Sequence, residues 1–104
     1  MKIKNLKIME LTVRIVSQGA IEEREFTNQQ TGQKEKFATM PFVLQHGSDK
    51  IFAEMIQEQA RKQAVLDPNY YYVASLSMQA RPWTDQQGKN RHENRIVLNR
   101  ISIL

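Results

Sequence analysis

The feature that most restricts the fold of this chain is the alternation of apolar and polar residues. In residues 34–45, one face carries Ala38, Met40, Phe42 and Leu44, which is the two-residue period of a β-strand with one buried side. Residues 8–17 and 70–81 show a similar alternation, and residues 95–104 are predicted to form a closing strand. The pattern predicts a mainly β protein, with these four side chains in its core.

One segment departs from the strand pattern. After a short strand predicted at residues 50–52, the apolar residues from about 53 to 65 follow the spacing of a helix face. This stripe is expected in the core and consists of Phe52, Met55, Ile56, Ala60 and Ala64. Pro68 ends the helix because proline cannot continue one.

The breaks between these segments set the order of the elements. Gly19 permits a bend or bulge, after which residues 22–26 continue the first strand. Residues 27–33 and 82–91 are polar and suit hairpin tips, and Pro41 indicates an edge or bulge position. The order is long strand, strand, strand, helix, strand, strand, which predicts an OB-fold: a five-stranded Greek-key barrel with one helix between strands 3 and 4. A meander with a stray helix would share part of this order.

Composition restricts the class of protein. The 104 residues suit one domain, 1–104, and the net charge of +4 is compatible with a polyanionic partner. Cysteine is absent, which excludes disulfides and thiolate metal sites. We expect a cytoplasmic protein without a cofactor. We do not expect an enzyme, because His46 and His92 lie far apart in sequence and no nucleophile or phosphate-loop motif occurs.

Residues 79–91 (QARPWTDQQGKNR), followed by 95–99 (RIVLN), resemble the end of the barrel in bacterial single-stranded DNA-binding proteins. That family carries an arginine, a spacer, a tryptophan, a Thr/Asp/Gly-rich turn, a basic residue and a valine-rich strand in this order. The resemblance covers roughly the last quarter of the chain. It implies binding of single-stranded DNA in replication, recombination or DNA transfer by a homo-oligomer, a dimer or tetramer. The primosomal replication proteins are a less close resemblance.

The rest of the chain departs from that family in two ways. The glycine-rich opening of the family's first strand is weak here, and the family's acidic C-terminal tail does not follow Ile103 and Leu104. We therefore expect a short version of the family, without the partner recruitment that this tail provides.

A non-specific binder of single strands needs aromatic rings to stack bases and cations to follow phosphates. The resemblance makes Trp83 the first stacking candidate, with packing on the barrel rim or an oligomer contact as the alternative. The same hairpin is basic, and its candidate phosphate contacts are Arg81, Lys89, Arg91 and Arg95. A merely solvated hairpin is the alternative for this group.

Three other aromatic residues are candidates. Phe37 alternates with the predicted core of its strand, so it points towards the groove unless the register slips by one residue. Lys34 and Lys36 are its candidate phosphate partners. Tyr71 either stacks a base or lines a subunit interface, and Phe26 either stacks or packs. The acidic group of Glu22, Glu23 and Glu25 is expected to point away from the groove or to pair with a neighbouring subunit.

Two other functions stay open at this point. OB barrels also serve as protein-interaction subunits, in which case residues 70–72 and the acidic group would be the working surface. Single-stranded RNA is the other alternative, because discrimination of the 2′-hydroxyl depends on local geometry.

Overall fold

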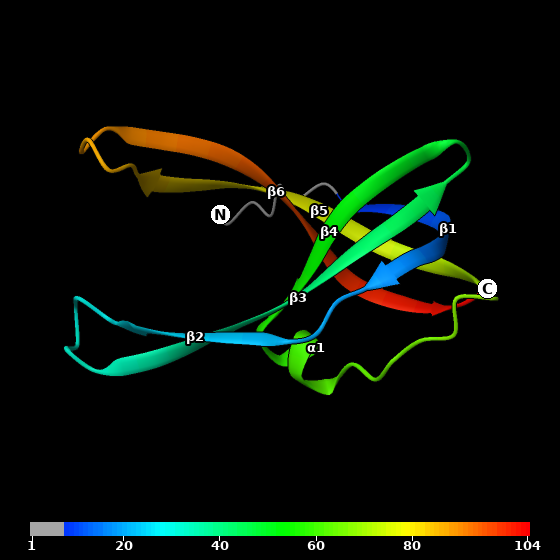
Figure 1. Ribbon diagram of the computed structural model, residues 1–104, viewed down its shortest axis with the longest axis horizontal. Coiled ribbons are helices and arrows are strands. Elements are labelled where there is room, and N and C mark those ends of the chain that lie inside the picture. The colour runs from blue at the N-terminus through cyan, green and yellow to red at the C-terminus, as the bar shows by residue number, and fades with distance from the viewer. Residues whose placement is uncertain (1–7) are drawn as a thin grey trace, which may run out of the picture.

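The computed structural model describes residues 8–104, except for the side chains of residue 8 and residues 81–83. Within this range it has six strands and one short helix (Figure 1). In chain order these are β1 (Ile8–Gln18), β2 (Glu22–Thr27), β3 (Lys34–His46), β4 (Asp49–Ile56), α1 (Gln57–Lys62), β5 (Tyr71–Thr84) and β6 (Asn90–Ile103).

Five of the strands close into a barrel. The sheet order is β1-β5-β6-β4-β3-β2, and a further pairing of β1 with β3 closes the ring. The paired strands are antiparallel except β4 and β6, which run parallel where Glu54 meets Val97. The protein is thus a small mixed β-barrel consistent with an OB-like fold, and its helix lies between β4 and β5.

The predicted alternation of β3 is confirmed. Ala38, Met40, Phe42 and Leu44 are all at most 6% exposed and belong to the core of the barrel. They pack with inward-facing side chains of the other strands, and the buried members of this set are Val13, Ile15, Ala53, Met55, Tyr72, Ala74, Leu76 and Leu98. No one-residue slip occurs, because such a slip would place the opposite face of β3 in the core.

The predicted boundary between the third strand and the helix is wrong. The strand continues to Ile56, and the helix begins only at Gln57 and ends at Lys62. Met55 is buried, as expected, but it belongs to the strand. Phe52 was expected in the core, yet its strand position between Ile51 and Ala53 turns it outwards, and it is 72% exposed.

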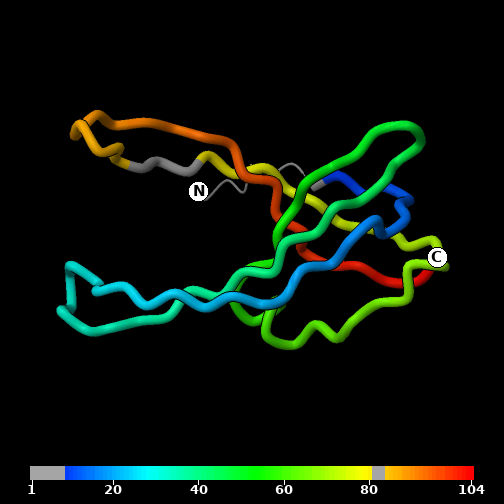
Figure 2. The backbone as a smooth tube through the Cα atoms, viewed as in Figure 1, coloured from blue at the N-terminus to red at the C-terminus, as the bar shows by residue number. Residues whose placement is uncertain are grey.

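The hairpin formed by β5 and β6 is longer than predicted. Its strands continue to Thr84 and resume at Asn90, so the turn is much shorter than the expected tip at 82–91. Met78 is exposed, whereas Tyr72, Ala74 and Leu76 of the same strand are buried. This hairpin and the β2–β3 hairpin both extend beyond the barrel, towards the left in Figure 2.

The path from β1 to β2 breaks opposite Pro41. Gln18 pairs with Phe42 and Glu22 pairs with Thr39. The three residues between Gln18 and Glu22 therefore face only two residues of β3. The backbone N–H of Gly19 donates to the Pro41 carbonyl at 2.8 Å. The prediction of a bend at Gly19 is confirmed. Pro41 lies opposite this break, while its own pairing with Glu54 of β4 is regular. Residues 22–27 form a separate strand that, among the described strands, pairs with β3 alone.

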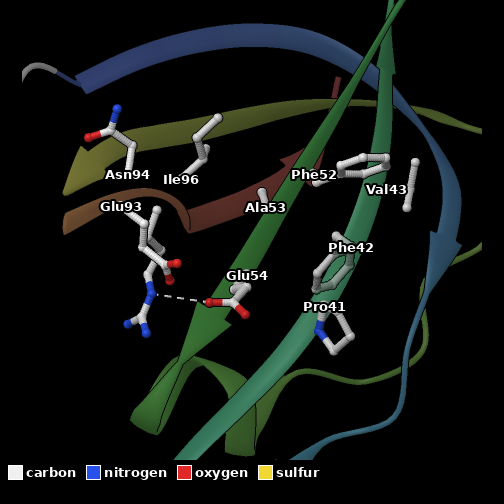
Figure 3. A pocket seen from close by; sticks show the side chains of 10 residues that line it. Pro41, Phe42, Val43, Phe52, Ala53, Glu54, Glu93, Asn94 and Ile96 are labelled. Carbon is white, nitrogen blue, oxygen red and sulfur yellow. Dashed lines mark ion pairs between the residues drawn. The ribbon is translucent and has the colours of Figure 1, made fainter. Parts of the chain in front are cut away.

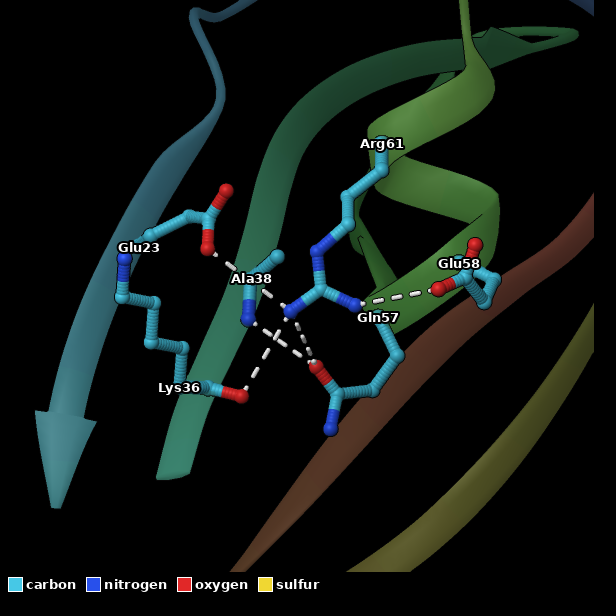
Figure 4. Close-up of polar contacts among 6 residues, drawn as sticks. All are labelled: Glu23, Lys36, Ala38, Gln57, Glu58 and Arg61. Carbon is cyan, nitrogen blue, oxygen red and sulfur yellow. Dashed lines mark hydrogen bonds and ion pairs between the residues drawn. The ribbon is translucent and has the colours of Figure 1, made fainter. Parts of the chain in front are cut away.

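The short helix α1 continues the hydrogen bonding of β3 beyond the end of β4 (Figure 4). The Gln57 side-chain oxygen accepts a hydrogen bond from the Ala38 N–H at 3.0 Å. Arg61 forms ion pairs with Glu23 at 3.7 Å and Glu58 at 3.3 Å. Gln57 adopts a positive φ of 54°, a conformation that non-glycine residues adopt only when their surroundings hold it.

Candidate functional site

The outer face of β2, β3 and β4 carries three phenylalanines, which we call the phenylalanine face: Phe26, Phe37 and Phe52. Arg24 of β2 lies directly opposite Phe37 of β3, so their side chains share one side of the hairpin. Phe26 is two residues after Arg24 and therefore lies on that side as well. Phe52 pairs with Val43, an outward-facing residue of β3. The three rings therefore follow β3 along one side of the molecule.

These rings are open to solvent to different degrees. Phe26 is 45% exposed and Phe52 is 72% exposed, whereas Phe37 is half-buried. The structure thus brings together two of the predicted aromatic residues, Phe26 and Phe37, and adds Phe52, which sequence reasoning had assigned to the core. Its strand alternation with Ile51 and Ala53 is compatible with an outward position, but the same segment also fits a helical stripe.

A cation lies over the central ring of this face. The Arg95 guanidinium carbon is 5.5 Å from the centre of the Phe37 ring, within the range of a cation–π contact. The Arg95 Nε lies 3.2 Å from a Glu54 carboxylate oxygen, the dashed line in Figure 3. Arg95 comes from β6, Phe37 from β3 and Glu54 from β4, so Arg95 and Phe37, which were predicted as separate candidates, meet across three strands.

Several pockets adjoin this contact, and two of them contain an exposed phenylalanine. One, of about 430 Å³, is lined by Arg24, Glu25, Phe26, Phe37 and Arg95. The other, of about 350 Å³, lies beside Phe52 (Figure 3) and is lined by residues of three strands: Pro41, Phe42, Val43, Phe52, Ala53, Glu54, Glu93, Asn94, Arg95 and Ile96. Each pocket combines an exposed ring with polar groups, an arrangement that suits a planar ligand with charged substituents.

The charges of this face differ from the expected ones. Lys34 and Lys36 alternate with Phe37 and therefore lie on the opposite face of β3. Arg24, which sequence reasoning did not single out, takes their place beside the ring. Glu22 was expected to point away, but it lines a pocket with Phe37 and Arg95. The face is therefore mixed in charge rather than uniformly basic.

The tip of the β5–β6 hairpin is organised by Asp85. Its side chain accepts hydrogen bonds from the backbone N–H groups of Gln87 and Lys89, both at 2.9 Å. The Arg91 Nε donates to the other carboxylate oxygen at 2.8 Å. Of the predicted phosphate contacts, Arg91 thus already has a carboxylate partner, while Lys89 is exposed at the turn.

We predict that the order of this tip is lost in acid. The hydrogen bond from Arg91, followed by that from the Lys89 backbone, lowers the pKa of Asp85 below its ordinary value of 3.8. A carboxyl group whose pKa is lowered by folding stabilises the folded tip at pH values above its ordinary pKa. This stabilisation is lost as the pH falls through the lowered pKa. The amide NMR signals of Gln87 and Lys89 should therefore shift with a midpoint below 3.8, and Asp85→Asn should remove this titration. A midpoint at or above 3.8 would contradict the assigned contacts.

Of the remaining predicted residues, those that the structure describes are not gathered at the phenylalanine face. The side chains of Arg81 and Trp83 lie outside the described residues, so their predicted roles stay predictions. Tyr71 lies at the other end of the barrel, where the Arg14 guanidinium carbon is 5.1 Å from the centre of its ring. Its pocket contains none of the residues of the phenylalanine face.

Among the described residues, no group of three or more His, Asp or Glu side chains is placed to hold a metal ion. No described helix has the length and apolar character needed to span a membrane.

Comparison with known proteins adds no further constraint. A scan against protein-family models, a search of curated proteins and a search of solved structures each gave no match.

Proposed function

We propose that this chain is an OB-fold protein that binds single-stranded DNA without sequence preference, with the phenylalanine face as its stacking surface. The observation that carries the proposal is the row of Phe26, Phe37 and Phe52 on the outside of a barrel, beside Arg24 and Arg95. Every base has an aromatic face, so rings of this kind accept any sequence. The resemblance of residues 79–91 to bacterial single-stranded DNA-binding proteins supports the same ligand, and a role in replication, recombination or DNA transfer.

Arg95 suits the contact between a base and its phosphate. A guanidinium carries five N–H donors, and Glu54 is paired with the Nε. We propose that the terminal nitrogens of Arg95 contact a phosphate oxygen, while its guanidinium carbon lies 5.5 Å from the centre of the Phe37 ring. Arg24 supplies a second cation at the same pocket, while Lys89 can follow the backbone further along the hairpin.

The carboxylates of the face limit its net charge. Glu22 and Glu54 line the pockets beside Phe37, and each repels a nearby phosphate. Stacking must therefore provide a larger share of the affinity than it would on a uniformly basic surface. We propose that the chain adds binding surface by forming a homo-oligomer, because one barrel covers only about 4–16 nucleotides.

A titration with labelled oligonucleotides tests this function. We expect oligo-dT of 16 nucleotides to bind more tightly than a duplex of the same length. With two to three phosphate contacts, the logarithm of the binding constant should fall against the logarithm of salt concentration with a slope of about −1.4 to −2.1. Fluorescence anisotropy measures both, and quenching of Trp83, the single tryptophan, independently tests the role of the hairpin.

The two alternative functions, binding of RNA and binding of another protein, are tested in the same way. Tighter binding of oligo-rU than of oligo-dT would identify RNA as the ligand. No binding of any oligonucleotide at low salt, together with a stable complex with another protein, would overturn the proposal in favour of a protein-interaction subunit.

A further inference from the structure

A separate pocket lies at the end of the barrel opposite the two extended hairpins. It has a volume of about 390 Å³ and is lined by Arg14, Ile15, Val16, Gln45, Gly47, Pro68 and Tyr71. These residues come from β1, from β3 and the turn after it, and from the approach to β5 (Figure 1). The pocket shares no residue with those beside Phe37 and Phe52.

The chemistry of this pocket suits a nucleotide. Arg14 lies 5.1 Å from the centre of the Tyr71 ring, and that tyrosine is 53% exposed. None of the residues lining the pocket is acidic, whereas Glu22 and Glu54 line the pockets beside Phe37. A guanidinium and an exposed ring without a carboxylate beside them can hold a phosphate and a stacked base together.

The pocket is connected to the phenylalanine face along β3. The outward residues of this strand run from Phe37 to Gln45, a distance of about 26 Å at 3.3 Å per residue. Gln45 pairs with Lys50 of β4 on one side and with Arg14 of β1 on the other. A single strand of DNA that leaves Phe52 along this line therefore passes Lys50 and reaches Arg14. On this path it meets no outward-facing carboxylate of β3.

We propose that the Arg14–Tyr71 pocket is a second nucleotide subsite on the same single strand, with the base stacked on Tyr71 and a phosphate held by Arg14. This inference rests on the proposed function. The path follows β3 from the phenylalanine face and turns around the end of the barrel. Only an oligonucleotide long enough to span both regions reaches the pocket.

Oligonucleotides of two lengths test this subsite. In Arg14→Gln and in Tyr71→Ala, the affinity for oligo-dT of 16 nucleotides should fall at least about fivefold, the low end of the loss of one stacked base. The affinity for oligo-dT of 5 nucleotides should stay unchanged, because that ligand occupies the phenylalanine face alone. In Arg14→Gln the salt slope for the long ligand should also become shallower by about 0.7. Tyr70→Ala, at the exposed tyrosine beside the pocket, is the control and should change neither affinity.

The outcomes separate this inference from the proposed function. Unchanged binding of the long ligand, or an equal loss for both lengths, overturns the subsite and leaves the proposed function standing. Saturable, Arg14-dependent binding of free thymidine monophosphate with no effect on the long oligonucleotide also overturns it, because the pocket then serves free nucleotides. Failure of the unmodified protein to bind either length overturns both.

Discussion

Replacing Phe37 and Phe52 together by alanine is expected to lower the affinity for single-stranded DNA about 30-fold or more, since each stacked base contributes about 1–3 kcal/mol. The effect of Phe52→Ala alone should be about 5-fold to 150-fold. Phe52 is the sharper probe, because its ring is mostly exposed and its removal takes little from the core. Fluorescence anisotropy with oligo-dT of 16 nucleotides measures the change.

Two controls separate stacking from general damage to the protein. Tyr70→Ala removes an exposed aromatic ring from the other end of the barrel and should leave this affinity unchanged. Phe52→Leu keeps an apolar side chain of similar size, so a loss as large as that of Phe52→Ala would identify the aromatic ring as the active group. Wild-type affinity in the double variant, with an unchanged melting temperature, would rule out the phenylalanine face as the binding surface.

Gly19→Ala is expected to destabilise the protein by about 1–3 kcal/mol, the usual range for a group forced into packed structure. A Cβ at this position would lie 2.6 Å from the Cγ of Pro41 and 3.1 Å from its Cδ. The proline ring is stiff, and the backbone of Gly19 is held to the Pro41 carbonyl by a hydrogen bond. Thermal unfolding should show the loss as roughly 4–8 °C in Tm for each kcal/mol.

The matched test is a double-mutant cycle with Pro41→Ala. The exposed proline ring contributes little to the core, so Pro41→Ala alone should change stability by less than Gly19→Ala does. Combined with Gly19→Ala, it should restore most of the lost stability, because it removes the atoms that the new Cβ would meet. Additive effects in the double variant would show that Gly19 is required for a reason other than this close approach.

The parts of the fold that sequence reasoning predicted well are those in which a two-residue period is long and unambiguous. In β3 the four core positions alternate without interruption, and the polar residues that flank the strand limit its register. Pro41 and Gly19 were informative because proline has a fixed φ and no N–H donor, whereas glycine adopts backbone conformations that other residues avoid. The two residues together mark the break between β1 and β2.

The boundary at β4 could not be predicted from local spacing. Met55 belongs both to the helical stripe with Phe52 and to a strand alternation with Ile51 and Ala53, so the pattern fits either structure. Pairing with β3 decides between them, because Thr39 takes Ile56 as its partner and the strand must reach that far. This tertiary pairing turns Phe52 outwards, which no local signal for a helix could indicate.

The candidate site was only partly predictable for a similar reason. Phe37 and Arg95 were both identified from the sequence, but their contact depends on β4 lying between their strands, where Glu54 forms an ion pair with Arg95. Lys34 and Lys36 were predicted as phosphate contacts because they are close to Phe37 in sequence. Strand alternation places them on the opposite face of β3 from the Phe37 ring. Arg24 is near the ring only because β2 pairs with β3 in the observed register.

Among the described strands β2 pairs with β3 alone, and this has a consequence for how the protein behaves at high concentration. A strand that ends a sheet presents free N–H and C=O groups to which a strand of another molecule can add. Here the strand reads Glu22, Glu23, Arg24 and Glu25 at its start, and stacking a second copy in register would bring like charges together. This hairpin is therefore protected against fibril-like aggregation by its own charges, even though it extends beyond the closed barrel.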